Sequence, residues 1–167
     1  MREETMTRKI IFERKIVEDD FAYLSENPEG EKLIVPLVEW QADPDKWLAG
    51  GRAVGVRVPS DKLPRDIPRI DELALIAVEF PRFTDGRGYS VGRMLRQRHA
   101  FRGQLRAVGW VLRDHLLAME RVGFNAFELQ AGKSLESALE AFGELPIAYQ
   151  ATVPDPRPLY RRRGLPA

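Results

Sequence analysis

The residues best suited to chemistry lie in a glycine-rich loop, where Asp85 and Arg87 stand two positions apart. The carboxylate could serve as a general acid or base, and a planar guanidinium binds carboxylates, phosphates and sulfur oxyanions through paired N–H donors. Thr84 and the glycines supply turn chemistry, because glycine adopts positive φ without strain. An alternative is that Asp85 only closes the turn and Arg87 lies in solvent. The predicted catalytic residue is Asp85, and the predicted substrate-binding residues are Thr84, Gly86, Arg87 and Gly88.

A second group of candidates follows in the segment 104–114. Arg106 falls inside an expected strand, so its side chain must find a partner or reach an edge of the sheet. Arg113 and Asp114 follow that strand directly. We predict Arg106 and Arg113 as substrate-binding and Asp114 as a second catalytic acid or base. His115 is the next residue after Asp114, and adjacent residues do not face each other on a helix, so their spacing predicts no His–Asp dyad.

The sequence contains no motif typical of a bound cofactor or metal ion. The chain has 2 histidines and no cysteine, which excludes thiolate-held iron–sulfur clusters and cysteine zinc sites. The stretch 131–134 ends like a phosphate-binding loop, but Phe127 stands where that motif requires its first glycine. A dinucleotide fingerprint starting at Gly86 fails because Val91 occupies the third glycine position. We therefore expect no cofactor and no metal.

Composition narrows the class of protein. With 26 Lys and Arg against 25 Asp and Glu, the net charge of +1 argues against general nucleic-acid affinity. A hydrophobic content of 44% over 167 residues suits one globular domain with a sizeable core. The first nine residues are charged, and no apolar run approaches the thickness of a bilayer. We expect a cytoplasmic protein without membrane contact.

The elements that must position these residues alternate between strand-like and helix-like patterns. Apolar runs bounded by turn residues predict strands, and apolar residues at helical spacing predict the helices between them. Asp43 and Pro44 suit the N-cap and first position of one helix, and Ser90 suits the N-cap of the helix after the glycine-rich loop. The expected strands are 33–38, 53–58, 73–80, 104–108 and 124–129; the expected helices are 43–48, 91–99, 114–122 and 134–142.

This alternation predicts the α/β class, because strands joined through helices form right-handed crossovers and a mainly parallel sheet. About five βα units make either an open doubly wound sheet or a partial barrel, since strand order leaves no trace in composition. Residues 9–17 add an N-terminal strand or hairpin. We expect one domain: an N-terminal hairpin and turn over 1–30, the α/β core over 31–145, and an extended tail rich in proline and arginine over 146–167.

In a parallel sheet, the loops that follow each strand share one edge. The 82–89 loop and the 109–114 turn should therefore meet at the carboxyl ends of the strands, where ligand sites of α/β sheets cluster. This arrangement would gather several arginines with a few carboxylates. It is typical of a site for a small anion.

Several spaced blocks resemble an uncharacterised bacterial family: FPRFTDGRG at 80–88, RAVG at 106–109, VLRD at 111–114 and GF at 123–124. The resemblance runs from about residue 33 to the C-terminal arginine cluster. Members of that family are commonly described as an oxidoreductase involved in sulfite reduction, and their genes lie beside a sulfite or nitrite reductase gene. This chain departs from the family pattern at Trp110, His115, Val122 and Asn125, where members usually carry Asp, Gln, Cys and Asp.

The resemblance implies a place in assimilatory sulfur metabolism. Electron transfer to sulfite requires a cofactor, and the chain offers neither cluster ligands nor a dinucleotide fingerprint. We therefore expect an accessory protein, not itself redox-active, that binds the sulfite or nitrite reductase or a small oxyanion. One alternative is a small-molecule enzyme acting on an anionic substrate at the same loop edge. Another is nucleic-acid binding through 82–121, against which the near-neutral charge counts.

Overall fold

The protein is organised around one eight-stranded sheet, described here in a computed structural model that covers residues 8–144 and 150–158. The strands follow the order β2-β1-β8-β7-β6-β5-β4-β3 across the sheet. Five helices accompany them in the described part of the chain. The strands are β1 (Lys9–Phe12), β2 (Lys15–Glu18), β3 (Ala22–Tyr23), β4 (Lys32–Pro36), β5 (Ala53–Val58), β6 (Leu75–Phe80), β7 (Gln104–Gly109) and β8 (Ala126–Phe127). The helices are α1 (Leu37–Ala42), α2 (Pro44–Leu48), α3 (Arg87–Gln97), α4 (Leu116–Arg121) and α5 (Leu135–Glu140).

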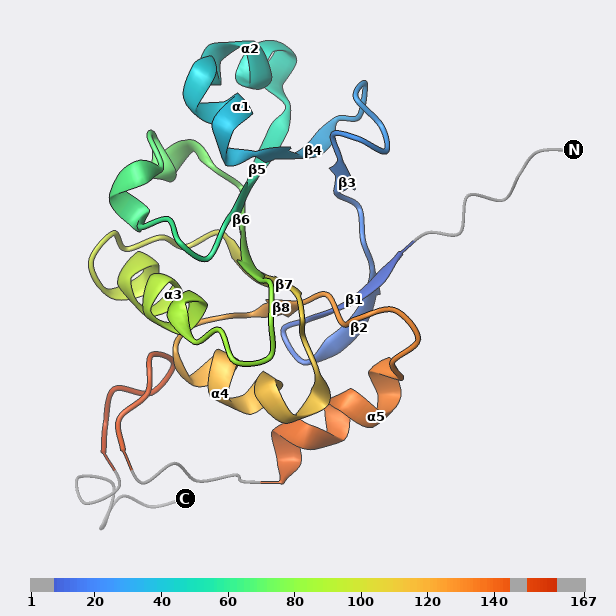
Figure 1. Ribbon diagram of the computed structural model, residues 1–167, viewed down its shortest axis with the longest axis vertical. Coiled ribbons are helices and arrows are strands. Elements are labelled where there is room, and N and C mark those ends of the chain that lie inside the picture. Colours follow the sequence, from blue (N-terminus) through green and yellow to red (C-terminus); the bar gives the residue numbers. More distant parts are fainter. Residues whose placement is uncertain (1–7, 145–149, 159–167) are drawn as a thin grey trace, which may run out of the picture.

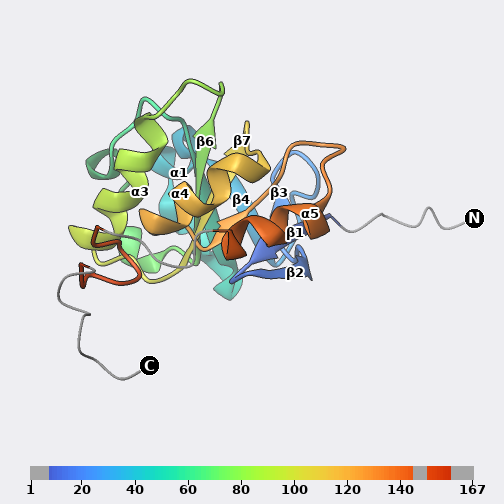
Figure 2. The same ribbon diagram turned by 90° about the horizontal axis from the view of Figure 1, so that it is seen from below.

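Strands β3 to β8 are parallel and lie side by side in chain order, while β1 pairs antiparallel with both β8 and β2. Because every crossover steps the same way, the helices gather on one face and the sheet curls into a half-barrel (Figure 1). Seen from below in Figure 2, α3, α4 and α5 form a row across the outer side. Of the two predicted architectures, the partial barrel is therefore the correct one, with more strands than five βα units supply.

The sheet buries different residues on its two faces. Side chains on the outer face, such as Val56, Val78 and Leu105, form the main hydrophobic core with the helices. The inner face holds a smaller apolar cluster. Alternation along β7 places Leu105 and Ala107 outside and Arg106 inside, as the two-residue period of a strand requires. The inner cluster consists of Phe21, Ile34, Leu75, Ala77 and Val108.

Several local predictions are confirmed. The N-terminal segment forms the hairpin β1–β2, and Asp43 caps α2 by accepting a hydrogen bond from the backbone N–H of Lys46 at 3.1 Å. Pro36 ends β4, as proline at a strand terminus can. Helix α1 was not predicted. It begins at Leu37, directly after the proline, and buries Leu37 and Trp40 at i, i+3 spacing.

The helix after the glycine-rich loop corrects two expectations. Helix α3 begins at Arg87 and not at 91, so Ser90 lies inside the first turn and caps nothing. Gly86 has φ −86°, and Gly88 is helical, so neither uses the positive φ that we expected. Gly88 is needed for close packing instead, since a Cβ there would lie 2.6 Å from the ring of Phe80.

The C-terminal third is less regular than predicted. The expected helix 114–122 splits into a 3-10 turn at Arg113–His115 and α4, and the expected strand 124–129 shortens to two residues in β8. Ser134 caps α5 through its hydroxyl. Of the predicted tail, residues 146–149 and 159–167 lie outside the described residues, while Val153 donates to the carbonyl of Arg121 at the end of α4. No helix among the described residues has the length and apolar character to cross a bilayer.

Candidate functional site

The loops that follow β6 and β7 meet at one edge of the sheet, as predicted. The backbone N–H of Trp110 donates to the carbonyl of Phe80 at 2.6 Å, and the rings of Phe83 and His115 lie 5.2 Å apart. Phe83 and Trp110 are 63% and 40% exposed, although both are large and apolar. The carboxyl edge of the half-barrel therefore presents exposed aromatic side chains.

Asp85 is the centre of a hydrogen-bond network at this edge. Its oxygens accept from Ser60 Oγ at 2.7 Å, from the Arg87 backbone N–H at 3.1 Å, and from Arg87 Nε and Nη2 at 3.0 and 2.7 Å. The hydrogen bonds from the Arg87 side chain, followed by that from Ser60, hold the pKa of Asp85 well below its usual range. An ionised carboxylate with these partners is a weak base, and Arg87 is neutralised by it. The geometry thus gives Asp85 a role in shaping the loop, with Thr84, Gly86 and Gly88 around it.

Arg113 and Asp114 do not join this group. The Arg113 guanidinium donates to the carbonyl of Ser137 at 2.9 Å and to the carboxylate of Glu144, so it holds the C-terminal helical segment against the turn after β7. Asp114 is exposed and forms no ion pair within the described part of the chain. Arg113 and Asp114 therefore do not line a common pocket with Asp85, as the predicted substrate-binding and catalytic roles would require.

Arg106 lies away from the predicted rim. It is fully buried on the inner face of the sheet, where its Nη1 and Nη2 donate to the two carboxylate oxygens of Asp19, each at 2.7 Å. Burial by itself would raise the pKa of Asp19, but the hydrogen bonds and charges of Arg106 and Arg8 outweigh burial and lower it. Arg106 is thus committed to an internal ion pair and is not available to a substrate at the rim.

The inner face carries further charges toward the carboxyl ends of its strands. Tyr23 donates its hydroxyl to Glu128 at 2.8 Å, and Arg57 donates to Glu79 at 3.0 Å. Arg8 donates to Asp19 at 2.8 Å. A signal for this network exists in the sequence, because Arg57, Glu79 and Arg106 are charged residues inside otherwise apolar strands. Of these three residues, Arg106 is the one predicted as a site residue.

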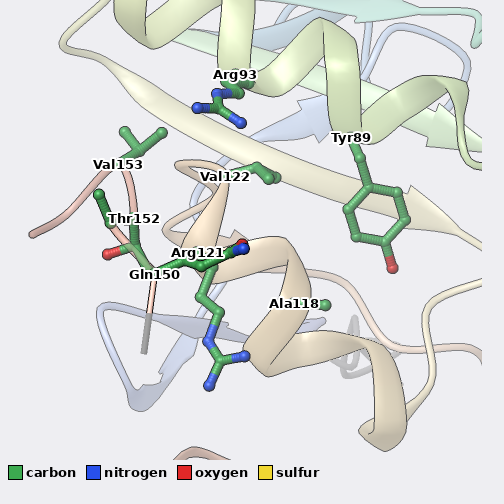
Figure 3. Close-up of a pocket in the computed structure, with 9 residues that line it drawn as sticks. Tyr89, Arg93, Ala118, Arg121, Val122, Gln150, Thr152 and Val153 are labelled. Atoms are coloured by element: carbon green, nitrogen blue, oxygen red, sulfur yellow. The ribbon is translucent and has the colours of Figure 1, made fainter. Parts of the chain in front are cut away.

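A cleft lies between α3 and α4 and has a volume of about 580 Å³ (Figure 3). Tyr89 and Arg93 project into it from α3, and Arg121 lies at the end of α4. Arg93 donates only to Gln97, at 3.0 Å, and the Arg121 side chain has no partner among the described residues. The complete lining is Tyr89, Arg93, Ala118, Arg121, Val122, Gln150, Ala151, Thr152 and Val153.

This cleft was not predicted. Neither Arg93 nor Arg121 is among the site residues that the sequence predicts. The proximity of Arg93 to 150–153 depends on how the C-terminal segment returns along α4, through the hydrogen bond from Val153 to Arg121. Across residues 8–144 and 150–158, no group of three or more His, Asp and Glu side chains is arranged to hold a metal ion.

Comparison with known proteins supplies a family. A family model described as "Bacterial protein of unknown function (DUF934)" matches residues 55–160, which is more than half of the chain. This segment contains the 80–88 loop, the α3–α4 cleft and β5 to β8. No curated protein matches the sequence.

Proposed function

The chain belongs to DUF934, a bacterial family of unknown function, and on that premise we propose that it is an anion-binding accessory protein of sulfite or nitrite reduction. The α3–α4 cleft is the proposed oxyanion site, in place of the Asp85 loop. The link to sulfite reduction rests on the resemblance of the 80–88, 106–109 and 111–114 blocks. In this role the protein binds and presents an anion and carries out no electron transfer itself.

The proposal rests on which arginines pair with a carboxylate of the protein and which do not. Arg87, Arg106 and Arg113 each donate to a carboxylate within the protein, so their charges are already compensated. Arg93 and Arg121 line the cleft without any carboxylate partner among the described residues. Arginine is suited to sulfur and phosphorus oxyanions because its donors match two oxygens at once. An uncompensated positive charge in a concave site attracts an anion.

Further donors lie around the two arginines. Gln150 offers a side-chain amide and Tyr89 a hydroxyl, whereas the hydroxyl of Thr152 is engaged with the backbone of Asp155. In Figure 3 the guanidinium of Arg121 extends away from that of Arg93. Arg93 and Tyr89 line the cleft from α3, and Arg121 lines it from the end of α4.

Titration calorimetry with sulfite, sulfate, phosphate and chloride tests the oxyanion site. Wild-type protein should bind the oxyanions and not chloride. Arg93→Gln and Arg121→Gln should each weaken binding by about tenfold, the equivalent of one charge-assisted hydrogen bond. Arg98→Gln is the matched control, because Arg98 is exposed at the end of the same helix and does not line the cleft. Equal affinity in all variants, or no binding by the wild type, would contradict the proposal.

The reductase is the proposed protein partner, and the exposed aromatic residues at the carboxyl edge are the surface that it would bury. Aromatic side chains are enriched at the centre of protein interfaces. A pull-down from cell extract should recover the sulfite or nitrite reductase with wild-type protein. Phe83→Ser with Trp110→Ser should abolish recovery, while Val38→Ser, at another large exposed apolar residue, should not. Failure of the wild type to recover the reductase would remove the partner and leave the oxyanion site to be judged separately.

A further inference from the structure

A second cavity opens at the mouth of the half-barrel, at the carboxyl ends of its strands. Its volume is about 520 Å³. Residues at the carboxyl ends of the parallel strands line it: Tyr23 of β3, Pro36 of β4, Arg57 of β5 and Glu128 just after β8. Ligand sites of α/β barrels and sheets lie at this end of the strands. The remaining lining residues are Arg8, Leu24, Ser25, Glu26, Ile34 and Glu39.

Two charged groups of opposite sign are only partly used inside this cavity. Arg57 donates through Nη2 to Glu79, and its Nε and Nη1 have no hydrogen-bond partner among the described residues. Glu128 accepts the Tyr23 hydroxyl on Oε2, and its Oε1 accepts no hydrogen bond within the same set. The Glu39 carboxylate, at the first turn of α1, also accepts no hydrogen bond from the residues that the structure describes. The cavity therefore offers open donors on one side chain and open acceptors on two others.

Tyr23 lies between these groups and holds them in place. The guanidinium carbons of Arg8 and Arg57 lie 4.6 and 5.7 Å from the centre of its ring. Burial, together with the charge of Glu128, raises the pKa of Tyr23 well above its usual value, so its hydroxyl stays protonated. It is then a permanent donor to Glu128 and orients the free oxygen of that carboxylate.

The charge balance argues against a simple ion as the occupant. Arg57 already forms an ion pair with Glu79, so a lone anion would bind to a guanidinium whose positive charge is partly compensated. Glu128 Oε2 lies 3.9 Å from Arg8 and 3.6 Å from Arg106, so a lone cation would meet the same difficulty. A ligand that carries both charges adds no net charge to the site and can pair each group with its opposite.

We propose that the mouth of the half-barrel binds a small zwitterion, an ammonium carboxylate of the size of a free amino acid. The ligand ammonium donates to Glu128 and Glu39, and the ligand carboxylate accepts from Arg57. This site is separate from the α3–α4 cleft and does not depend on it, because the two cavities share no lining residue.

Thermal-shift measurements with a panel of free L-amino acids, followed by calorimetry on those that stabilise the full chain, test this proposal. At least one amino acid should bind, and its analogues without the amine or without the carboxylate should bind about tenfold more weakly. Glu39→Gln should weaken binding by a similar factor. Glu31→Gln should leave it unchanged, because Glu31 is exposed at the other end of β4.

The opposite results are equally specific. If no amino acid binds, or if the amine-free and carboxylate-free analogues bind as well as the amino acid, the zwitterion site is wrong. Unchanged affinity in Glu39→Gln and Arg57→Gln also overturns it, and Glu39 is exposed, so that variant should fold even if Arg57→Gln does not. Arg93→Gln separates the two cavities, since it should weaken oxyanion binding and leave amino-acid binding intact.

Discussion

Arg106 and Asp19 form a buried bidentate ion pair, with each of the two nitrogen–oxygen distances at 2.7 Å and both side chains fully buried. Arg106 belongs to β7 in the middle of the sheet, whereas Asp19 lies on the segment that connects β2 with β3. Because β2 and β3 are the two edges of the sheet, this segment crosses the open side of the half-barrel (Figure 1). The ion pair thus holds the crossing segment to the inner face.

Replacing one partner of this pair should destabilise the protein strongly. Asp19→Asn removes the negative charge and leaves Arg106 buried without compensation, which typically costs about 3–5 kcal/mol. Urea denaturation should show this loss. Asp20→Asn is the control, because Asp20 is exposed and pairs with Lys32 at the surface, where an ion pair contributes about 0–1 kcal/mol.

The double variant Asp19→Leu with Arg106→Met separates the charge effect from packing. Apolar replacements of similar volume for a buried ion pair are often neutral or stabilising by about 1–4 kcal/mol. We expect the double variant to be clearly more stable than Asp19→Asn. Equal instability of both would show that the pair is required for a reason other than charge compensation.

The same pair should make stability depend on acidity. The pKa of Asp19 is lowered in the folded protein from its ordinary 3.8 by Arg106 and Arg8, against the opposing effect of burial. Because the pKa is lower in the folded protein, the unfolded chain takes up the proton at a higher pH than the folded protein does. The contribution of the ion pair to stability is therefore complete above the ordinary pKa of Asp19 and is lost as the pH falls through the pKa of the folded state. Urea titrations from neutral pH to about pH 3 should show a steeper loss for wild type than for the double variant.

Tyr23 should affect stability at the opposite end of the pH scale. Its pKa is raised by burial and by Glu128, so the folded phenol keeps its proton while an unfolded tyrosine ionises near its ordinary 10.0. The stability present below that value therefore declines as the pH rises above it. Ultraviolet titration should show one tyrosine that does not ionise until the protein unfolds. Tyr23→Phe should remove this tyrosine from the titration.

Gly88 should tolerate no side chain. A Cβ would lie 2.6 Å from the buried ring of Phe80, which packs edge-to-face with Tyr89 and Phe124. Gly88→Ala should cost about 1–3 kcal/mol through overpacking. Gly143→Ala is the matched control, because nothing lies within 4 Å of a Cβ there, and a change near zero or a slight gain in stability is expected.

Asp85→Asn distinguishes the two anion sites that we have considered. If Asp85 only shapes its loop with Ser60 and Arg87, then Asp85→Asn and Arg87→Gln should leave oxyanion affinity unchanged. Calorimetry with sulfite on both variants measures this. A large loss of affinity would return the oxyanion site to the glycine-rich loop.

The sequence was most informative where the deciding interactions are local. The spacing Asp43–Pro44 specifies a capped helix start through one side chain and one backbone N–H, and the six residues of β5 read directly as a strand from their apolar pattern. Ser90 misled us because a suitable capping residue does not by itself decide where a helix begins. Helix α3 begins earlier, at Arg87, and Gly88 in its first turn packs against the ring of Phe80.

By itself the sequence determined the α/β class, the mainly parallel sheet and the meeting of the loops after β6 and β7. These features follow from side-chain periodicity and from the handedness of crossovers. Tertiary structure alone decided that the sheet curls into a half-barrel. It also decided that Arg87, Arg106 and Arg113 pair with carboxylates, while Arg93 and Arg121 have no carboxylate partner in the described parts of the chain. Asp19 and Arg106 are separated by 87 positions, and no local pattern links them. The charge state of a site depends on such distant partners, so it emerges only when the chain is folded.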